Sequence, residues 1–317
     1  MNFIEKFQSV VILIAVGVGL FLGQYSIFEK NAETFILPFL LFMLYGLFLT
    51  IPLQNLKAAL KNVKFLGTST VLNFVWTPML AWGLGAIFLS DHPALWLGFI
   101  LFLVTPCTDW YLIFTSIARG NMSLSTSVLP VNLILQVMLL PAYLFIFAGT
   151  METVGLSTII ESVIFVLFVP FLLANITRYL FNKKKAFLEK KLIPFFSLSQ
   201  IVFLCLAIVA MFASQGYYLI NNLEVIFLIL IPLLLFFIIN FFVAQTVGKV
   251  FKFSYEDTVS LNMTTIARNS PVALAIVVTA FPDQPLIALA LIIGPLIELP
   301  VLAIVSQSLL RIRKLVK

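Results

Sequence analysis

The chain has 317 residues, of which 62% are hydrophobic and 10% are charged. This composition excludes a soluble globule, because so few polar residues cannot cover its surface, and it requires a lipid bilayer as solvent. The formal net charge of +6 is spread over short segments between apolar runs. The basic residues therefore indicate membrane topology and contacts with lipid headgroups, and not a nucleic-acid partner.

Apolar windows bounded by charged or turn residues predict an all-α membrane protein with ten transmembrane helices. A hydrocarbon core about 30 Å thick needs roughly 20 apolar residues per helix, which leaves room for about ten spans and for no soluble domain. Residues 1–317 are thus expected to form a single transmembrane domain. In chain order the windows are 7–24, 34–53, 65–89, 94–117, 124–148, 158–180, 192–214, 223–250, 257–281 and 285–310.

The distribution of cations predicts the orientation, because lysine and arginine near span ends are retained on the cytoplasmic side. With a cytoplasmic N-terminus, all 19 lysines and arginines except Lys30 and Arg268 lie on the cytoplasmic side. Lys30 then lies on the opposite side, and Arg268 lies inside a span. The sequence therefore predicts an inner-membrane protein with an even number of spans and both termini in the cytoplasm.

The two halves of the chain, about 1–150 and 155–317, contain five windows each, which predicts two inverted five-helix repeats. Both halves interrupt their fourth window with polar residues, at 105–109 (TPCTD) and 264–271 (TTIARNSP). Helices four and nine are therefore expected to be broken and to cross near the bilayer midplane.

Each interruption places a hydroxyl residue directly before a proline, Thr105-Pro106 and Ser270-Pro271, which is typical of an N-cap and the first position of a new helix. Proline also removes a backbone donor and pushes the preceding residue out of the helical region, so each span must open locally. Open backbone at this depth is tolerated only beside protein or a wet cavity. We interpret the pair as a polar binding centre; ordinary proline kinks are the alternative.

Three ionisable residues lie at membrane depth: Asp109, Arg268 and Glu298. Each costs at least about 2.5 kcal/mol to insert, so they are expected to be paired or functional. Because the guanidinium of Arg268 stays charged, we expect Asp109 or Glu298 to be its partner.

The polar residues of the interruptions and of the fifth span are the candidate substrate-binding residues. In that fifth span, Asn132 and Gln136 share a helix face, where they either contact a substrate or bind neighbouring helices. Cys107 is expected near the start of a half-helix, where the dipole favours a thiolate, whereas Cys205 is expected to be a packing residue. The full candidate set is Cys107, Thr108, Asp109, Asn132, Arg268, Asn269 and Ser270.

The sequence contains no metal-ligand cluster, phosphate-binding loop or catalytic-triad pattern. We therefore expect no metal and no cofactor, and transport is driven by an ion gradient or by the gradient of the substrate itself. An intramembrane hydrolase using Cys107 or Asp109 would need a partner in register, and no such signature is present. The protein is expected not to be an enzyme.

Three segments, 106–108 (PCT), 267–276 (ARNSPVALAI) and 294–300 (GPLIELP), resemble the superfamily of bile acid:sodium symporters and arsenite efflux permeases, and lie nearer the arsenical-resistance type. The resemblance implies ten spans, cytoplasmic termini and crossed helices four and nine. It also implies that Cys107 handles arsenite, a thiophilic species, and that Glu298 couples transport to protons.

The same resemblance argues against sodium coupling. Thr264 and Arg268 stand where the sodium symporters carry an acidic residue and a glutamine, so a fixed guanidinium lies near the position of the cation. The chain differs from the permeases by its Asp109-Trp110 pair and by Arg268-Asn269 in place of two asparagines.

Taken together, the residues and the resemblance predict a secondary active transporter for proton-coupled efflux of arsenite or a related metalloid. The alternative is ion-coupled transport of an organic anion, in which Arg268 and the N-termini of two half-helices receive a carboxylate or sulfonate.

Overall fold

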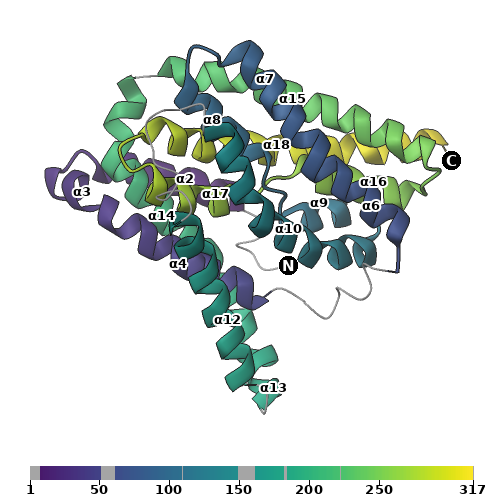
Figure 1. The fold of residues 1–317 in the computed structure, drawn as a ribbon, viewed down its shortest axis with the longest axis horizontal. Coiled ribbons are helices and arrows are strands. Elements are labelled where there is room, and N and C mark those ends of the chain that lie inside the picture. Colours follow the sequence, from purple (N-terminus) through teal and green to yellow (C-terminus); the bar gives the residue numbers. More distant parts are fainter. Residues whose placement is uncertain are drawn as a thin grey trace. The chain divides into compact units, whose positions relative to one another are not determined.

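The computed structural model describes residues 8–50, 61–108, 110–148, 161–181, 184–221 and 223–316 (Figure 1). These residues are almost entirely helical, and their only β-structure is one isolated bridge. The predicted all-α class is therefore confirmed for the described part of the chain. Asp109 lies outside the described residues.

Seven described helices are long and apolar enough to cross a membrane. Each overlaps one of the ten windows predicted from the sequence, and the remaining three windows contain shorter apolar helices. The ten-span count and the inverted repeats stay predictions. The seven are Glu33–Thr50, Val63–Phe88, Met122–Phe147, Glu161–Leu180, Leu188–Ser214, Phe227–Val250 and Pro285–Lys314; the shorter three are Val10–Leu22, Pro93–Leu103 and Ser270–Ala280.

The chain forms two compact units. The first contains Met1–Ile51, Glu152–Val225 and Pro271–Ile292, and the second contains Pro52–Met151, Ile226–Ser270 and Ile293–Lys317. Each unit therefore combines segments from both halves of the sequence.

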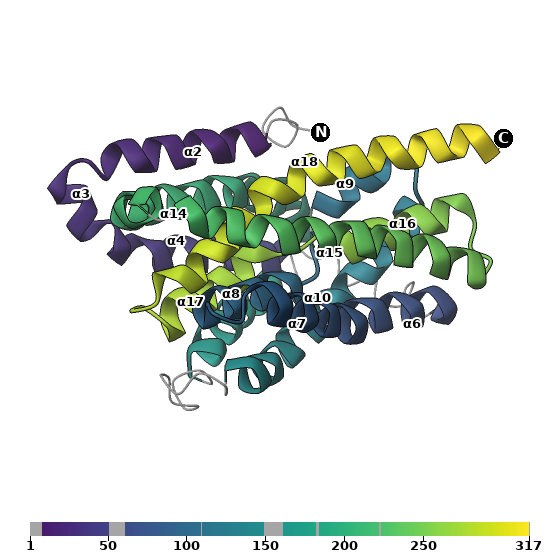
Figure 2. The same cartoon turned by 90° about the horizontal axis from the view of Figure 1, so that it is seen from above.

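The first unit is built around α14, which lies beside α4 and α2 (Figure 2). Glycines at the contact let the backbones approach, since a Cβ added to Gly19 would lie 2.7 Å from the carbonyl oxygen of Val209. A Cβ on Gly23 would lie 2.7 Å from that of Ala213. The helices are α2 (Gln8–Leu22), α3 (Ser26–Asn31), α4 (Glu33–Thr50), η3 (Ile164–Phe168), α12 (Val169–Leu180), α13 (Lys185–Phe187), η5 (Leu188–Leu192), α14 (Ile193–Asn221), most of α17 (Ser270–Ala280) and the start of α18 (Pro285–Val316).

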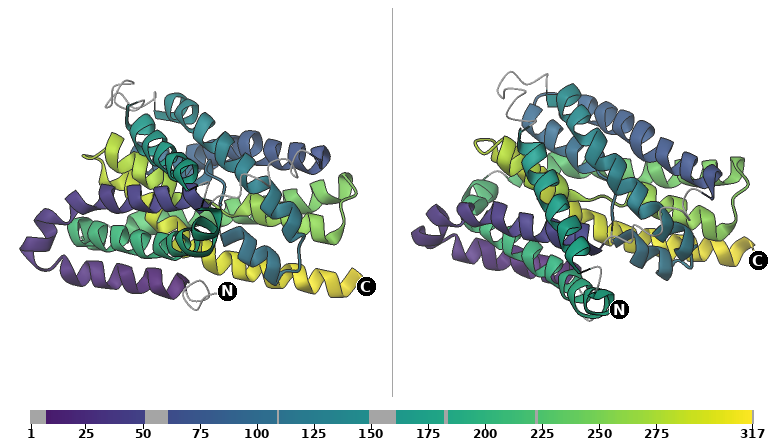
Figure 3. Two further views of the ribbon diagram at one scale, coloured as in Figure 1. Left: turned by 90° about the horizontal axis from the view of Figure 1, so that it is seen from below. Right: turned by 60° about the horizontal axis from the view of Figure 1, so that its bottom comes forward.

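The second unit contains both interruptions, and its elements include the blue helices after residue 61 and the yellow C-terminal helix in Figure 3. A buried apolar cluster joins its elements: Phe65, Leu72, Leu124, Val128, Ala244 and Leu261. The helices are α6 (Val63–Val71), η2 (Leu72–Trp76), α7 (Thr77–Phe88), α8 (Pro93–Leu103), α9 (Trp110–Ile117), α10 (Met122–Ala148), most of α15 (Leu223–Val250), α16 (Tyr255–Ile266) and the later part of α18.

The fourth predicted span is interrupted between the end of α8 at Leu103 and the start of α9 at Trp110. The expectation that the second half-helix begins at Pro106 is therefore wrong, and Cys107 lies in extended chain before it. The hydroxyl of Thr105 does not cap a new helix, because it donates back to the carbonyl oxygens of Leu101 (3.2 Å) and Phe102 (2.9 Å). Its role is to close the end of α8.

The ninth predicted span is interrupted between the end of α16 at Ile266 and the start of α17 at Ser270. Pro271 is the second residue of α17, a position at which its missing N–H costs no helical hydrogen bond. The residue that precedes this helix is Asn269, and not Ser270 as the sequence pattern suggested.

Candidate functional site

The two interruptions pair with each other through their backbones. Pro106 and Arg268 form an isolated antiparallel bridge. The N–H of Cys107 donates to the carbonyl oxygen of Ala267 at 3.0 Å, and the N–H of Asn269 donates to that of Thr105 at 2.7 Å. Backbone groups that leave a helix at this depth must find partners in protein, because lipid offers none. Each break thus supplies the hydrogen bonds that the other lacks.

Polar side chains gather where the breaks pair. The amide nitrogen of Asn269 lies 3.3 Å from the hydroxyl oxygen of Thr108. Cys107 is 4% exposed, and Thr108, Asn269 and Ser270 are also buried. Cys107 forms no disulfide with Cys205, which lies in α14 of the first unit. The paired breaks therefore place a buried thiol beside hydroxyl and amide groups, which is a chemically mixed centre.

The guanidinium of Arg268 is surrounded by oxygen acceptors and not by a carboxylate of the described residues. Its Nη1 donates to the carbonyl oxygen of Leu103 at 3.0 Å, and its Nε donates to that of Ile266 at 3.3 Å. Its Nη2 donates to Oδ1 of Asn73 at 3.3 Å, and its Cζ lies 5.4 Å from the ring centre of Phe236. The arginine is only 2% exposed, so these contacts, together with the electrostatic interaction with Glu298, compensate for burying its charge.

Glu298 contacts Arg268 differently from the predicted ion pair. One carboxyl oxygen accepts the backbone N–H of Arg268 at 2.8 Å, and the other has no hydrogen-bond partner. The residue is fully buried, and it lies between Pro295 and Pro300 inside α18. The carboxyl group is therefore attached to the ninth-span break through the main chain and retains one unused oxygen.

Close packing brings α18 to this position. A Cβ added to Gly294 would lie 2.6 Å from the ring of Phe102 on α8. No other side chain fits here without moving the ring, so the glycine of the sequence motif serves helix packing.

A second polar group lies on α10. The amide nitrogen of Asn132 donates to the hydroxyl oxygen of Thr264 on α16 at 3.0 Å, while its Oδ1 has no partner. One turn further along α10, both amide atoms of Gln136 are buried without a hydrogen-bond partner. Buried polar atoms in this state call for a water or ligand. The sequence left open whether these two amides contact a substrate or a neighbouring helix. Asn132 contacts the neighbouring helix α16, whereas both polar atoms of Gln136 are without a hydrogen-bond partner.

Sequence reasoning missed Asn73 and Phe236, which complete the surroundings of Arg268. Asn73 lies in η2, a short π-helix between α6 and α7. The same π-turn contains Trp76, whose indole N–H donates to Oδ1 of Asn240 at 3.1 Å. Single π-turns within helices often mark functional sites, but the sequence pattern of η2 resembles that of any apolar helix.

At the start of α16, the hydroxyl of Tyr255 donates to the carbonyl oxygen of Ala118 at 3.0 Å, and the guanidinium of Arg313 lies over its ring. Burial raises the pKa of Tyr255 above its ordinary value, although the nearby positive charge of Arg313 opposes this. Arg313 also forms an ion pair with Glu256 at 3.2 Å. These contacts hold the end of α18 against the end of α16 that is opposite the break.

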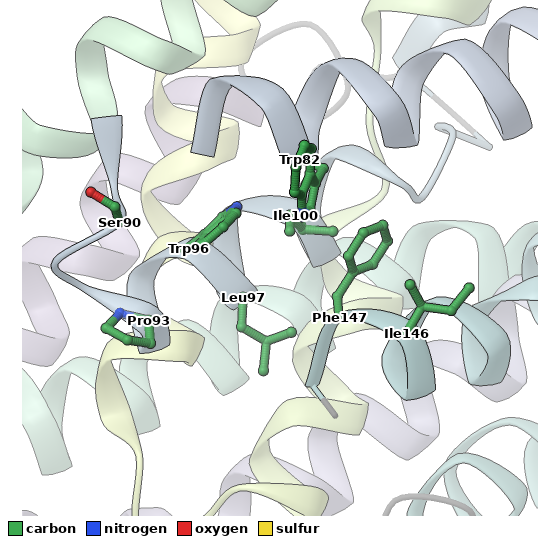
Figure 4. Close-up of a pocket in the computed structure, with 8 residues that line it drawn as sticks. All are labelled: Trp82, Ser90, Pro93, Trp96, Leu97, Ile100, Ile146 and Phe147. Atoms are coloured by element: carbon green, nitrogen blue, oxygen red, sulfur yellow. The ribbon is translucent and has the colours of Figure 1, made fainter. Parts of the chain in front are cut away.

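A cavity of about 210 Å³ lies in the same unit, between α7, α8 and the end of α10 (Figure 4). Two tryptophans dominate its lining, with ring centres 6.2 Å apart. None of the candidate residues named from the sequence lines this cavity. Its lining residues are Trp82, Ser90, Pro93, Trp96, Leu97, Ile100, Ile146 and Phe147.

Several membrane-length apolar helices, together with two helices interrupted at one polar centre, define a multi-pass membrane transporter. Residues 37–222, more than half of the chain, match the Sodium Bile acid symporter family. The chain belongs to this family, which consists of transporters and not of enzymes.

Similar proteins extend over nearly the whole chain. The "Arsenical-resistance protein Acr3" of Corynebacterium glutamicum is 27% identical, with 95% of this chain and 87% of the relative covered. The protein of the same name from Alkaliphilus metalliredigens is 22% identical, with 95% and 90% covered. The "Uncharacterized transporter slr0944" of Synechocystis is 26% identical, with 97% and 88% covered. The resemblance inferred from three short motifs is thereby confirmed.

Proposed function

We propose that this transporter is a secondary, proton-coupled efflux system for arsenite or a related metalloid. The observation that carries the proposal is that two chemically distinct groups attach to neighbouring residues of one break. The backbone N–H of Cys107 donates a hydrogen bond to the carbonyl oxygen of Ala267, and a carboxyl oxygen of Glu298 accepts one from the backbone N–H of Arg268. A candidate substrate ligand and a candidate proton carrier therefore contact the same short segment.

The chemistry of the two groups fits a metalloid. Trivalent arsenic is thiophilic. The thiol of Cys107 would replace one hydroxyl of arsenous acid, so that a sulfur–arsenic bond forms and an S–H and an arsenic–oxygen bond break with release of water. Thr108, Asn269 and Asn132 offer hydrogen bonds to the remaining hydroxyls. Two relatives that align over 95% of this chain have names that refer to arsenical resistance, which supports this substrate class.

Glu298 is the proposed proton-coupling residue. Its unused carboxyl oxygen can take up or release a proton without breaking the hydrogen bond that the other oxygen accepts from Arg268. A group that changes protonation while it stays attached to the substrate-binding break is suited to linking the two events.

For the architecture, we propose ten spans in two inverted repeats, with both termini in the cytoplasm of an inner-membrane protein. The seven membrane-length helices and three shorter apolar helices together occupy all ten predicted windows. Each compact unit draws on both sequence halves, as a repeated plan would require. The asymmetric placement of lysine and arginine supports the orientation.

Transport of an organic anion is the second candidate, because the family description refers to a sodium–bile acid symporter. The N-terminus of α17 at Ser270 would offer backbone donors to a carboxylate or sulfonate. The contacts of Arg268 argue against it, since each of the three guanidinium nitrogens already donates to an oxygen.

The test is arsenite accumulation in an arsenite-sensitive bacterial strain, and arsenite uptake into everted vesicles, for the parent and two matched variants. Cys107→Ser nearly preserves volume, so a loss of transport at normal expression reports sulfur chemistry. Cys205→Ser should transport like the parent, because this cysteine lies in α14 outside the break. Full transport by Cys107→Ser would exclude thiolate contact and favour the organic-anion candidate.

A further inference from the structure

The position of the Arg268 guanidinium at the ends of two helices is the starting observation. Leu103 is the last residue of α8, and Ile266 is the last residue of α16. Arg268 donates to the carbonyl oxygens of both. The last carbonyls of a helix have no partner within it and carry the negative end of the helix dipole. One side chain thus closes the C-terminal ends of both interrupted helices.

We infer that Arg268 is a positioning residue, a fixed internal cation that holds the paired breaks together and does not receive an anionic substrate. This inference deepens the proposed function, since it takes the paired breaks as the substrate site. It differs from the role in substrate binding that the sequence suggested for Arg268.

The hydrogen bonds of the guanidinium disfavour a bidentate anion in the observed conformation, because they use three of its five N–H groups, one on each nitrogen. Each of the three guanidinium nitrogens donates to an oxygen, at 3.0 to 3.3 Å. The ring of Phe236 covers one face of the group. A carboxylate or sulfonate that binds side-on would need the Nε–H that now donates to the carbonyl oxygen of Ile266, and would have to displace this helix-terminal carbonyl.

The main chain of Arg268 connects its guanidinium to the other residues of the site through hydrogen bonds. The bridge partner of Arg268 is Pro106, and its N–H is bonded to Glu298. Its neighbours Ala267 and Asn269 form the two bridge hydrogen bonds to the fourth-span break. If the guanidinium is removed, three buried oxygen acceptors lose their donor while the bridge remains as two backbone hydrogen bonds. The breaks should then separate more often.

The experiment uses Cys107 as a reporter of this separation and requires no substrate. In a Cys205→Ser background, Cys107 is the only thiol of the chain. The purified full-length protein is reconstituted, and the rate of Cys107 alkylation by a small maleimide is compared between the parent and Arg268→Ala. We expect alkylation to become about tenfold faster or more, as removal of a charged hydrogen-bond donor from a buried site should produce.

Chemical rescue separates positioning from general loss of structure. Millimolar guanidinium chloride, far below denaturing concentrations, should restore protection of Cys107 in Arg268→Ala. Urea at the same concentration, with a similar planar shape and no charge, should not. Arg313→Ala is the matched control, because this arginine pairs with Glu256 at the other end of α16 and should leave the alkylation rate unchanged.

Equal alkylation rates for the parent and Arg268→Ala would overturn the inference, and so would rescue by urea as effective as rescue by guanidinium. If Arg268→Ala does not fold, Asn73→Leu removes one acceptor and should give a smaller increase in the rate; no increase would be equally contradictory. Failure of arsenite transport by the parent protein would refute the proposed substrate without changing this substrate-free result.

Discussion

Replacement of Glu298 by two residues of similar size separates its two proposed roles. Glu298→Gln keeps an oxygen that can accept the backbone N–H of Arg268, now bonded at 2.8 Å, but removes the exchangeable proton. Glu298→Leu removes both. Comparison of the two variants therefore distinguishes proton coupling from support of the break.

The expected stability costs follow from the observed hydrogen bond. Neutral hydrogen bonds contribute about 0.5–1.5 kcal/mol, and Glu298→Gln keeps such a bond, so this variant should differ from the parent by less than about 1 kcal/mol in free energy of unfolding. Glu298→Leu leaves the buried N–H of Arg268 unsatisfied, which lowers the free energy of unfolding by about 1–3 kcal/mol more. Thermal unfolding in detergent, monitored by tryptophan fluorescence, ranks the stability of the parent and the two variants.

The transport assay is arsenite uptake into everted vesicles with and without an imposed pH gradient. We expect the gradient to accelerate uptake by the parent and to have no effect on Glu298→Gln, because a carboxamide neither gains nor loses a charge by protonation in this pH range. A Glu298→Gln protein that responds to the gradient like the parent would refute the assignment of Glu298 as the proton carrier. If Glu298→Gln were only as stable as Glu298→Leu, the hydrogen bond between the residue 298 side chain and the backbone N–H of Arg268 would be refuted.

Two further predictions concern packing and surface charge. Gly85→Ala should destabilise the protein by about 1–3 kcal/mol, because a Cβ at this position would lie 2.0 Å from the ring of Trp96. Gly83→Ala on the same helix is the control, since its Cβ would meet nothing within 4 Å and the change should be neutral or slightly stabilising. Thermal unfolding in detergent compares the two variants, and equal effects would contradict the packing of Gly85 against Trp96. Arg313→Ala should lower the free energy of unfolding by less than about 1 kcal/mol, since the ion pair of Arg313 with Glu256 is partly exposed. In the same assay, a higher salt concentration should reduce the difference in stability between this variant and the parent.

The positions of the two breaks were predictable from local chemistry, whereas their partners were not. Proline beside polar residues in an apolar run requires open backbone wherever it occurs, so both interruptions follow from the sequence. The start of α9 at Trp110 does not, because Pro106 is held in extended chain by a bridge to Arg268, far away in the sequence. A long-range backbone pairing thus overrides the N-cap pattern.

The surroundings of Arg268 show a second limit of sequence reasoning. A buried cation predicts compensation, and carboxylates are the partners that composition makes visible. Carbonyl groups at helix ends leave no mark in the sequence, so the contacts with Leu103 and Ile266 were outside its reach. Asn73 was hidden for a related reason, because a π-turn within an apolar helix has no distinctive pattern.

The bridge between the breaks is made of main-chain atoms, and this has a consequence for how such proteins diversify. The donors and acceptors of its two hydrogen bonds are present in every residue except proline, which lacks the donor. The side chains at positions such as Cys107, Thr108 and Asn269 can therefore change during evolution without loss of the pairing. One scaffold can in this way acquire selectivity for chemically unrelated solutes, in agreement with a family whose own name refers to bile acids and with similar proteins whose names refer to arsenical resistance.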